Sequence, residues 1–243
     1  MGRRQFVLGA SAGLQGVMCA AAAGQRVTQL SQVSRVKVLY TFGDSILDCA
    51  PYNTQGVHPG QLLVRNNDVL FPEFHGRDLQ SLGPARLEHR AVDGATVRSL
   101  PGQARKLSHQ EGAVAILTIG GNDLLAGLAA DKGKGKGIEA FASLLEQFLV
   151  ELPVRPVFLG NVYDPTFGDD ARNFLGVPAG LARVNHRRVN EVIARLARRT
   201  GGLVDLHGHF LQGDPSWFTR TIEPSLRGAS EVRRAFMPAL GLA

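Results

Sequence analysis

Cysteine is scarce in this sequence. Its 243 residues include two cysteines, and one of them, Cys19, lies in an N-terminal segment that is lost if it is cleaved as an export signal. The remaining thiol, Cys49, cannot form a disulfide within the chain, so we predict a fold that is stable without one. Internal repeats and strongly biased segments are lacking as well. A hydrophobic fraction of 44% therefore suits one well-filled α/β domain over residues 36–243.

Acidic residues are fewer than basic ones, 21 against 27, which gives a net charge of +6. Aromatic side chains are not interleaved with the arginines, and no known nucleic-acid-binding motif accompanies them. We therefore expect no nucleic-acid partner and interpret the excess arginine as solvated helix faces.

The N-terminus has the pattern of an export signal. Arg3 and Arg4 precede a run of small apolar residues that ends in four alanines, Ala20 to Ala23. The paired arginines resemble a twin-arginine signal, which exports proteins that have already folded. Residues 1–24 are thus predicted to be a secretory signal segment, and the protein to be periplasmic or secreted. If the segment is not a functional signal, the protein is cytoplasmic.

Short apolar runs alternate with stretches long enough for helices. Continuous apolar character, as in residues 114–119, is typical of strands that are covered on both faces. Such an alternation predicts a doubly wound parallel sheet. The expected strands are residues 36–42, 87–92, 113–119, 156–162 and 202–206, and the expected helices are residues 137–152, 181–200 (capped by Gly201-Gly202) and 225–240.

A serine follows the first expected strand directly, in the segment Gly43-Asp44-Ser45. Because ligands gather at the carboxyl ends of parallel strands, this is a position where chemistry usually occurs. Gly43 permits a tight turn, and we expect Ser45 to open the next helix. The free N–H groups of that helix would favour the negative charge that a serine nucleophile creates on its substrate.

Two further loops begin at the ends of neighbouring strands. The segment Gly120-Gly121-Asn122-Asp123 follows the third expected strand and brings an amide suited to an oxyanion hole. Gly94, after the second strand, offers an unobstructed backbone N–H to the same edge of the sheet. Three strand ends that supply serine, glycine and asparagine predict a single catalytic cleft.

In this order the segments resemble the GDSL/SGNH hydrolase family, from Val38 to the C-terminus. The resemblance implies a flavodoxin-like three-layer α/β/α fold with a five-stranded parallel sheet. It implies that Ser45 is the nucleophile, and that the oxyanion hole consists of the Ser45 and Gly94 N–H groups and the Asn122 side chain. We also expect Asp44, Gly121 and His58 to contact the substrate. The resemblance further implies a small-molecule, lipid or sugar ester as substrate, without a metal or organic cofactor.

The final motif of that family, Asp-x-x-His-Pro, is altered here. Aligned on Pro224, the histidine is replaced by Glu223 and the aspartate by Arg220. The usual base and its orienting acid are therefore missing, and a serine hydroxyl is a poor nucleophile unless another group takes its proton.

Several residues could supply the missing base. We prefer His207 at the end of the fifth expected strand, oriented by Asp205 or Asp214. Glu223 itself is an alternative, with its pKa raised by burial if the neighbouring arginine points away. His58, on the loop after the nucleophile, is a third candidate, and the absence of any effective base is a fourth possibility.

The sequence thus predicts an exported esterase or lipase that acts through an acyl-enzyme. Two alternatives stay open: a binding protein that kept the pocket but lost catalysis, and an acyltransferase that uses the same serine.

Overall fold

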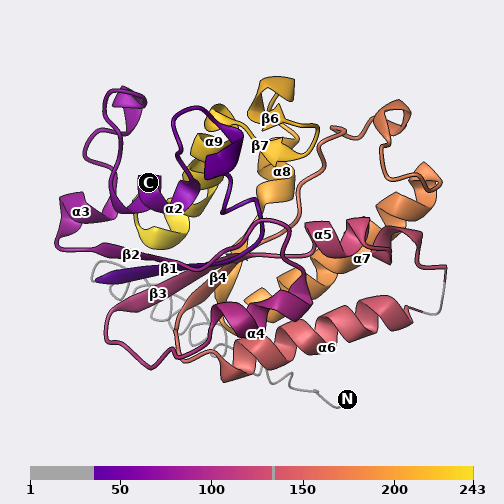
Figure 1. Ribbon diagram of the computed structural model, residues 1–243, viewed down its shortest axis with the longest axis horizontal. Helices are drawn as coiled ribbons and strands as arrows, with labels where there is room; N and C mark the ends of the chain where they lie inside the picture. The colour runs from indigo at the N-terminus through magenta and orange to yellow at the C-terminus, as the bar shows by residue number, and fades with distance from the viewer. Residues whose placement is uncertain (1–35, 133–134, 243) are drawn as a thin grey trace, which may run out of the picture.

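The computed structural model describes residues 36–132 and 135–242. Its centre is a parallel sheet with strand order β2-β1-β3-β4-β5 (Figure 1). This confirms the predicted five-stranded parallel sheet and the α/β class. The predicted signal segment, residues 1–24, lies outside the described residues. The strands are β1 (Val38–Gly43), β2 (Arg86–His89), β3 (Ala113–Thr118), β4 (Val157–Gly160) and β5 (Gly201–Val204).

Helices cover both faces of the sheet and make three layers (Figure 1). On one face lie α4 (Leu100–Gln103), α6 (Lys136–Glu151) and α7 (Ala179–Ala197). On the other face lie α2 (Pro59–Val64), α8 (Leu206–Phe210) and α9 (Leu226–Phe236). Two short helices, α3 (Leu79–Leu82) and α5 (Gly121–Leu125), complete the set. None of the helices in the described part of the chain is both long and apolar enough to cross a membrane.

The apolar residues that recur with helical periodicity in the sequence are the ones that pack against the sheet. Ile138, Phe141, Leu145 and Phe148 recur on one face of α6 and are all buried in the core cluster beneath the sheet. The strands β1 and β3 are buried at every residue, as their continuous apolar character predicts.

Three local expectations were wrong. Ser45 does not open a helix but lies in a single turn, in which the N–H groups of Leu47 and Asp48 donate to the carbonyl of Asp44. Gly201-Gly202 does not cap α7 but begins β5, because α7 already ends at Ala197. The second strand ends at His89, and residues 90–92 continue beside β1 as a loop.

A small hairpin lies outside the main sheet and precedes α9. Its strands β6 (Phe218–Thr219) and β7 (Glu223–Pro224) pair antiparallel, with Thr219 opposite Glu223. The connecting residues Arg220 and Thr221 have φ angles of 45° and 75°, a left-handed conformation that non-glycine residues rarely adopt. This hairpin carries the residue that replaces the family's histidine.

Gly43 ends β1 at the point where the chain turns toward Ser45. Its φ is +118°, and a Cβ atom at this position would lie 1.7 Å from the carbonyl oxygen of Thr118 on the adjacent strand. The side-chain amide of Gln103 bonds both the N–H and the carbonyl of Gly43, each at 2.7 Å. The turn that presents the serine therefore requires glycine for steric as well as conformational reasons.

We predict that Gly43→Ala lowers the free energy of unfolding by about 3 kcal/mol or more, because β1 and β3 must separate locally to admit the methyl group. The matched control is Gly56→Ala, at φ +60° with no atom within 4 Å of the added Cβ. This substitution should lower the free energy of unfolding only by the cost of placing an alanine in the left-handed conformation, about 1–2 kcal/mol. Urea unfolding of both variants checks the difference, and equal costs would contradict the steric explanation.

Candidate active site

Ser45, at the carboxyl end of β1, and Glu223, on the hairpin, are close enough for their side chains to interact. Both are nearly inaccessible, with 8% and 9% of their surface exposed. Burial raises the pKa of Glu223, and its interaction with the Ser45 hydroxyl opposes part of that rise. The Oε2 atom of Glu223 is buried without a hydrogen-bond partner among the described residues. A carboxylate with a free lone pair beside a serine hydroxyl can accept its proton.

The Glu223 hairpin is held on two sides. The hydroxyl of Tyr163, after β4, donates to the carbonyl oxygen of Ile222 at 2.6 Å. The guanidinium of Arg220 lies 5.1 Å from the centre of the Tyr52 ring, a cation–π contact. The Tyr52 hydroxyl in turn donates to the carboxylate of Asp93. Both contacts thus fix the chain immediately before Glu223.

The loops that carry the expected oxyanion donors are joined to each other. The side-chain amide of Asn122, in the first turn of α5, donates to the carbonyl oxygen of Ala95 at 3.0 Å. Next to it, the carboxylate of Asp123 accepts the N–H of Val97 at 3.1 and 3.2 Å. Gly94 has a φ of +75°, and no atom lies within 4 Å of a Cβ added there. The segments that carry Asn122 and Gly94 are therefore fixed relative to each other.

Asp44 fixes the turn of the serine from inside the protein. Its Oδ1 accepts the Thr118 hydroxyl at 2.9 Å and the Ile46 N–H at 3.2 Å. Burial, together with the nearby carboxyls of Glu223 and Asp123, raises the pKa of Asp44 to about 7. Asp44 thus takes part in building the turn beside the nucleophile.

The preferred base, His207, lies at the start of α8. Its backbone N–H donates to Asn161 at 2.8 Å, and its ring lies 5.0 Å from the ring of His186. Asp205 caps α8, accepting from the Asn161 amide at 2.8 Å and from the Gly208 N–H at 2.9 Å. These two bonds lower the pKa of Asp205 although burial opposes them. Within the described residues no hydrogen bond joins His207 to Ser45, so its role as base stays a prediction.

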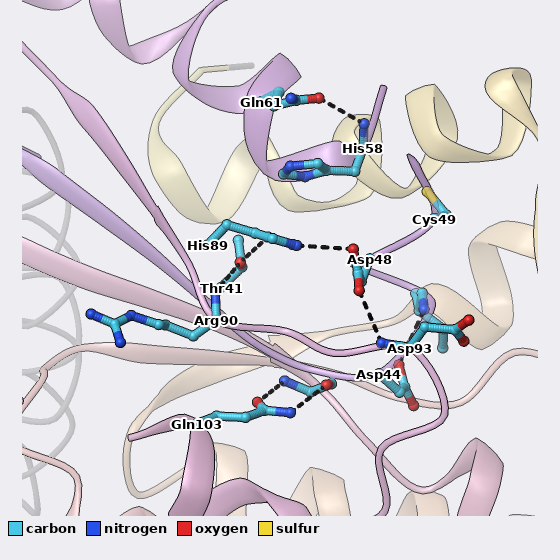
Figure 2. A network of polar contacts seen from close by, with 12 residues as sticks. Thr41, Asp44, Asp48, Cys49, His58, Gln61, His89, Arg90, Asp93 and Gln103 are labelled. Atoms are coloured by element: carbon cyan, nitrogen blue, oxygen red, sulfur yellow. Dashed lines mark hydrogen bonds and ion pairs between the residues drawn. The ribbon is translucent and has the colours of Figure 1, made fainter. Parts of the chain in front are cut away.

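The third candidate, His58, belongs to a different group of side chains. It precedes α2, and its ring stacks on His89 with the centroids 4.0 Å apart (Figure 2). His89 contacts the Thr41 hydroxyl at 2.7 Å and Asp48 at 3.1 Å. Burial lowers the pKa of His58 to about 4, with a further contribution from His89. This imidazole is therefore neutral at pH 7 and is directed at His89 beside the sheet.

Asp48 connects this group to the loop of Gly94. One of its carboxylate oxygens contacts His89, and the other accepts the N–H of Asp93 at 2.9 Å (Figure 2). The interaction supports the loop that precedes the expected oxyanion donor.

A pocket with a volume of about 110 Å³ opens beside Ser45. It lies between α5, the segment after β4 and α7, and Asp44, Gly121 and Asn122 line it together with Ser45. The expected substrate-binding positions Asp44 and Gly121 are thus brought together with the nucleophile, whereas His58 does not appear among its described lining residues.

Sequence reasoning missed the wall of this pocket that follows β4. Tyr163, Asp164 and Arg183 line it, as does His186 on α7. Ser45, Gly94 and Asn122 were predicted because they follow the carboxyl ends of strands. Tyr163 follows the carboxyl end of the fourth strand, so the same criterion would have predicted it. His186 gave no such signal, because it lies in the middle of an arginine-rich helix.

Comparison with known proteins gives a consistent result. The model of the GDSL-like Lipase/Acylhydrolase family matches residues 41–229. LAE5, an alpha/beta hydrolase enzyme from the metagenome of Lake Arreo, Spain, is 22% identical, with a TM-score of 0.58 over 85% of this chain and 95% of its own. Axe2, an acetylxylan esterase from Geobacillus stearothermophilus, is 19% identical, with a TM-score of 0.58 over 85% and 96%. No curated protein matches the chain.

These two structures show the same fold, as the sequence predicted. In the described part of the chain, no group of three or more His, Cys, Asp or Glu side chains is placed to hold a metal ion.

The raised pKa of Asp44 predicts a specific dependence of stability on pH. Between the unfolded value of 3.8 and the folded value of about 7, the folded state binds more protons, so the free energy of unfolding falls as pH rises through this window. A shift of this size corresponds to at most about 4 kcal/mol. Asp44→Asn should remove most of this fall, because a neutral amide keeps the acceptor for Thr118 and Ile46.

Urea unfolding at pH 4.5 and pH 8 measures this effect as the difference between wild type and variant. Glu191→Gln, at an exposed position of α7, is the control for removing a carboxyl charge. If Asp44→Asn and Glu191→Gln change the pH dependence equally, the assignment of the buried proton to Asp44 is wrong.

Proposed function

Because this chain belongs to the GDSL-like lipase/acylhydrolase family and is an ester-hydrolysing enzyme, we propose that it cleaves carboxylic esters through an acyl-enzyme on Ser45, with Glu223 as the general base. The observation that carries this proposal is the interaction of the buried Glu223 carboxyl with the Ser45 hydroxyl, which lowers the pKa of Glu223 against the effect of burial. Export of the protein, which residues 1–24 predict, is part of the same proposal.

In the first step Glu223 takes the proton of the Ser45 hydroxyl as its oxygen attacks the acyl carbonyl. The backbone N–H groups of Ser45 and Gly94 and the amide of Asn122 stabilise the oxyanion. Glu223 then returns the proton to the leaving alcohol, and the ester bond breaks. Water attacks the acyl-enzyme with Glu223 again as base, and releases the carboxylic acid and free Ser45.

Arg220 supports Glu223 in this role. The family pairs a histidine base with an aspartate, so that the base becomes a cation beside an anion. Here the charges are reversed. The base is an anionic glutamate, and the positively charged Arg220 occupies the position of the family's aspartate. The positive charge of Arg220 lowers the pKa of Glu223, although burial and Asp93 raise it. We infer that Arg220 is a positioning residue that keeps Glu223 ionised.

The first test is hydrolysis of p-nitrophenyl butyrate. Ser45→Ala should lower kcat by about 10⁴-fold or more, because it removes the nucleophile. Glu223→Gln should lower kcat by about 10²- to 10⁴-fold, because an amide cannot accept the proton. His207→Ala and His58→Ala should stay within about threefold of wild type.

A fluorophosphonate probe should label wild type and fail to label Ser45→Ala. Loss of activity in His207→Ala with full activity in Glu223→Gln would identify His207 as the base instead. Binding without turnover or labelling would favour the binding protein, and transfer to an added alcohol in preference to water would favour the acyltransferase.

The pH dependence provides a second test. Because the active form of Glu223 is ionised, kcat/KM should fall as pH drops through its pKa, which burial raises above the ordinary value for glutamate. Arg220→Gln should move this acid limb to higher pH, whereas Arg220→Lys should leave it near the wild-type position.

The double variant Arg220→Asp, Glu223→His rebuilds the family's usual final motif, and its acid limb should lie near pH 6.5. An acid limb that is the same in wild type, Arg220→Gln and this double variant would contradict both the base and its positioning residue.

A further inference from the structure

The pocket beside Ser45 is apolar on most of its wall. Its hydrophobic lining includes Leu124, Leu125, Val162, Phe174, Leu175 and Ala182. They come from α5, from the segment between β4 and α7, and from α7 itself. This wall is continuous with the nucleophile, since Ser45 lines the same pocket.

The charged groups of the pocket are already paired. Arg183 contacts Asp164 at 3.1 Å and also Asp170. His186 bonds the carbonyl oxygen of Val162 at 2.8 Å, and burial, the largest cause, lowers its pKa. An ion-paired guanidinium and a neutral imidazole give little reason for a charged or sugar group to enter this space.

The pocket lies on one particular side of the catalytic groups. Among the described residues, Ser45, Asn122 and Ile222 line it, whereas Glu223, the next residue, and Gly94 do not. The leaving alcohol must receive its proton from Glu223 and therefore departs on that side. The acyl group, on the other side of the carbonyl carbon, then points into the pocket. On the opposite side, Asp93 and Gly94 are exposed, which leaves room for the alcohol.

Two large hydrophobic side chains are exposed where they line this pocket. Leu125 is 45% exposed and Phe174 is 39% exposed. Apolar side chains exposed beside a pocket are typical of a site that an apolar ligand covers. An acetyl group would leave most of this wall uncovered, whereas a longer chain would contact it.

On the basis of the proposed serine mechanism, we infer that the substrate is an ester with an unbranched apolar acyl chain of about four to eight carbons, bound in the pocket between α5 and α7. Burial of one methylene is worth about 0.8 kcal/mol, which corresponds to a fourfold gain in kcat/KM. The rate should thus rise with each added methylene until the pocket is full.

The test is a series of p-nitrophenyl esters from acetate to octanoate. Wild type should show kcat/KM for hexanoate at least about tenfold above that for acetate. Ala179→Phe, at the half-buried first residue of α7 that lines the pocket, should remove this preference and leave acetate within about twofold of wild type. A flat profile, or one that Ala179→Phe does not alter, would overturn the assignment.

Leu125→Asp places a charge on the exposed wall of the pocket and should also lower the rate for hexanoate but not for acetate. Its matched control is Leu211→Asp, at a leucine that is 42% exposed at the end of α8 and does not line the pocket in the described residues. The control should keep the wild-type profile, and equal effects of the two variants would overturn the assignment.

A binding measurement separates this inference from the mechanism on which it rests. Ser45→Ala should bind hexanamide at least about tenfold more tightly than acetamide by calorimetry, and Ala179→Phe in the same background should abolish the difference. If no ester is turned over but this preference holds, the serine mechanism fails and the pocket assignment stands. If esters are cleaved but neither measurement depends on chain length, the pocket assignment alone fails.

Discussion

The site depends on one contact, that between the hydroxyl of Ser45 and the carboxylate of Glu223. The serine directly follows β1 of the main sheet, but the carboxylate comes from a hairpin whose strands are two residues long. The backbone hydrogen bonds of so short a hairpin cannot by themselves fix the orientation of a side chain. The contacts of Tyr52 with Arg220 and of Tyr163 with Ile222 supply the missing constraint. The strained φ angles between the two strands persist because these contacts determine them.

Three carboxyl groups lie close together around this contact, on Asp44, Asp123 and Glu223. Burial raises the pKa of each of them, and like charges in a low dielectric cannot all ionise freely. The environments separate their roles. Asp44 is enclosed and keeps its hydrogen bonds within the turn, whereas Glu223 lies between Ser45 and the charge of Arg220. Similar groups in different surroundings commonly divide such tasks in enzymes.

Much of this arrangement was accessible from the sequence. The alternation of apolar runs predicted the sheet, and the ends of the strands predicted that Ser45, Gly94 and Asn122 meet at one edge. The sheet is confirmed, and Ser45 and Asn122 line one pocket, because a parallel sheet fixes where its strands end; that Gly94 joins them stays a prediction. The helix ends and the turn at Ser45 were less well predicted, since they depend on tertiary bonds such as those of Asp44 with Thr118 and Ile46.

The base was harder to predict for a different reason. Residue type favoured His207, and this residue does lie near the end of a strand. It belongs to the first turn of α8, however, and its side chain packs near His186. Alignment on Pro224 favoured Glu223, which the structure places beside the serine. Nothing in the sequence shows the direction of a side chain on a two-residue strand, nor the tyrosine rings that hold it.

The two glycines at the edge of the site differ in what they would tolerate. Gly43 is enclosed by the neighbouring strand, while Gly94 faces open space on the side where the alcohol leaves. An asparagine or aspartate, which adopts left-handed conformations more readily than other residues, could stand at position 94 without displacing any atom. Selectivity for the alcohol portion could therefore evolve by a single exchange at the rim, while the nucleophile and its acyl pocket stay as they are.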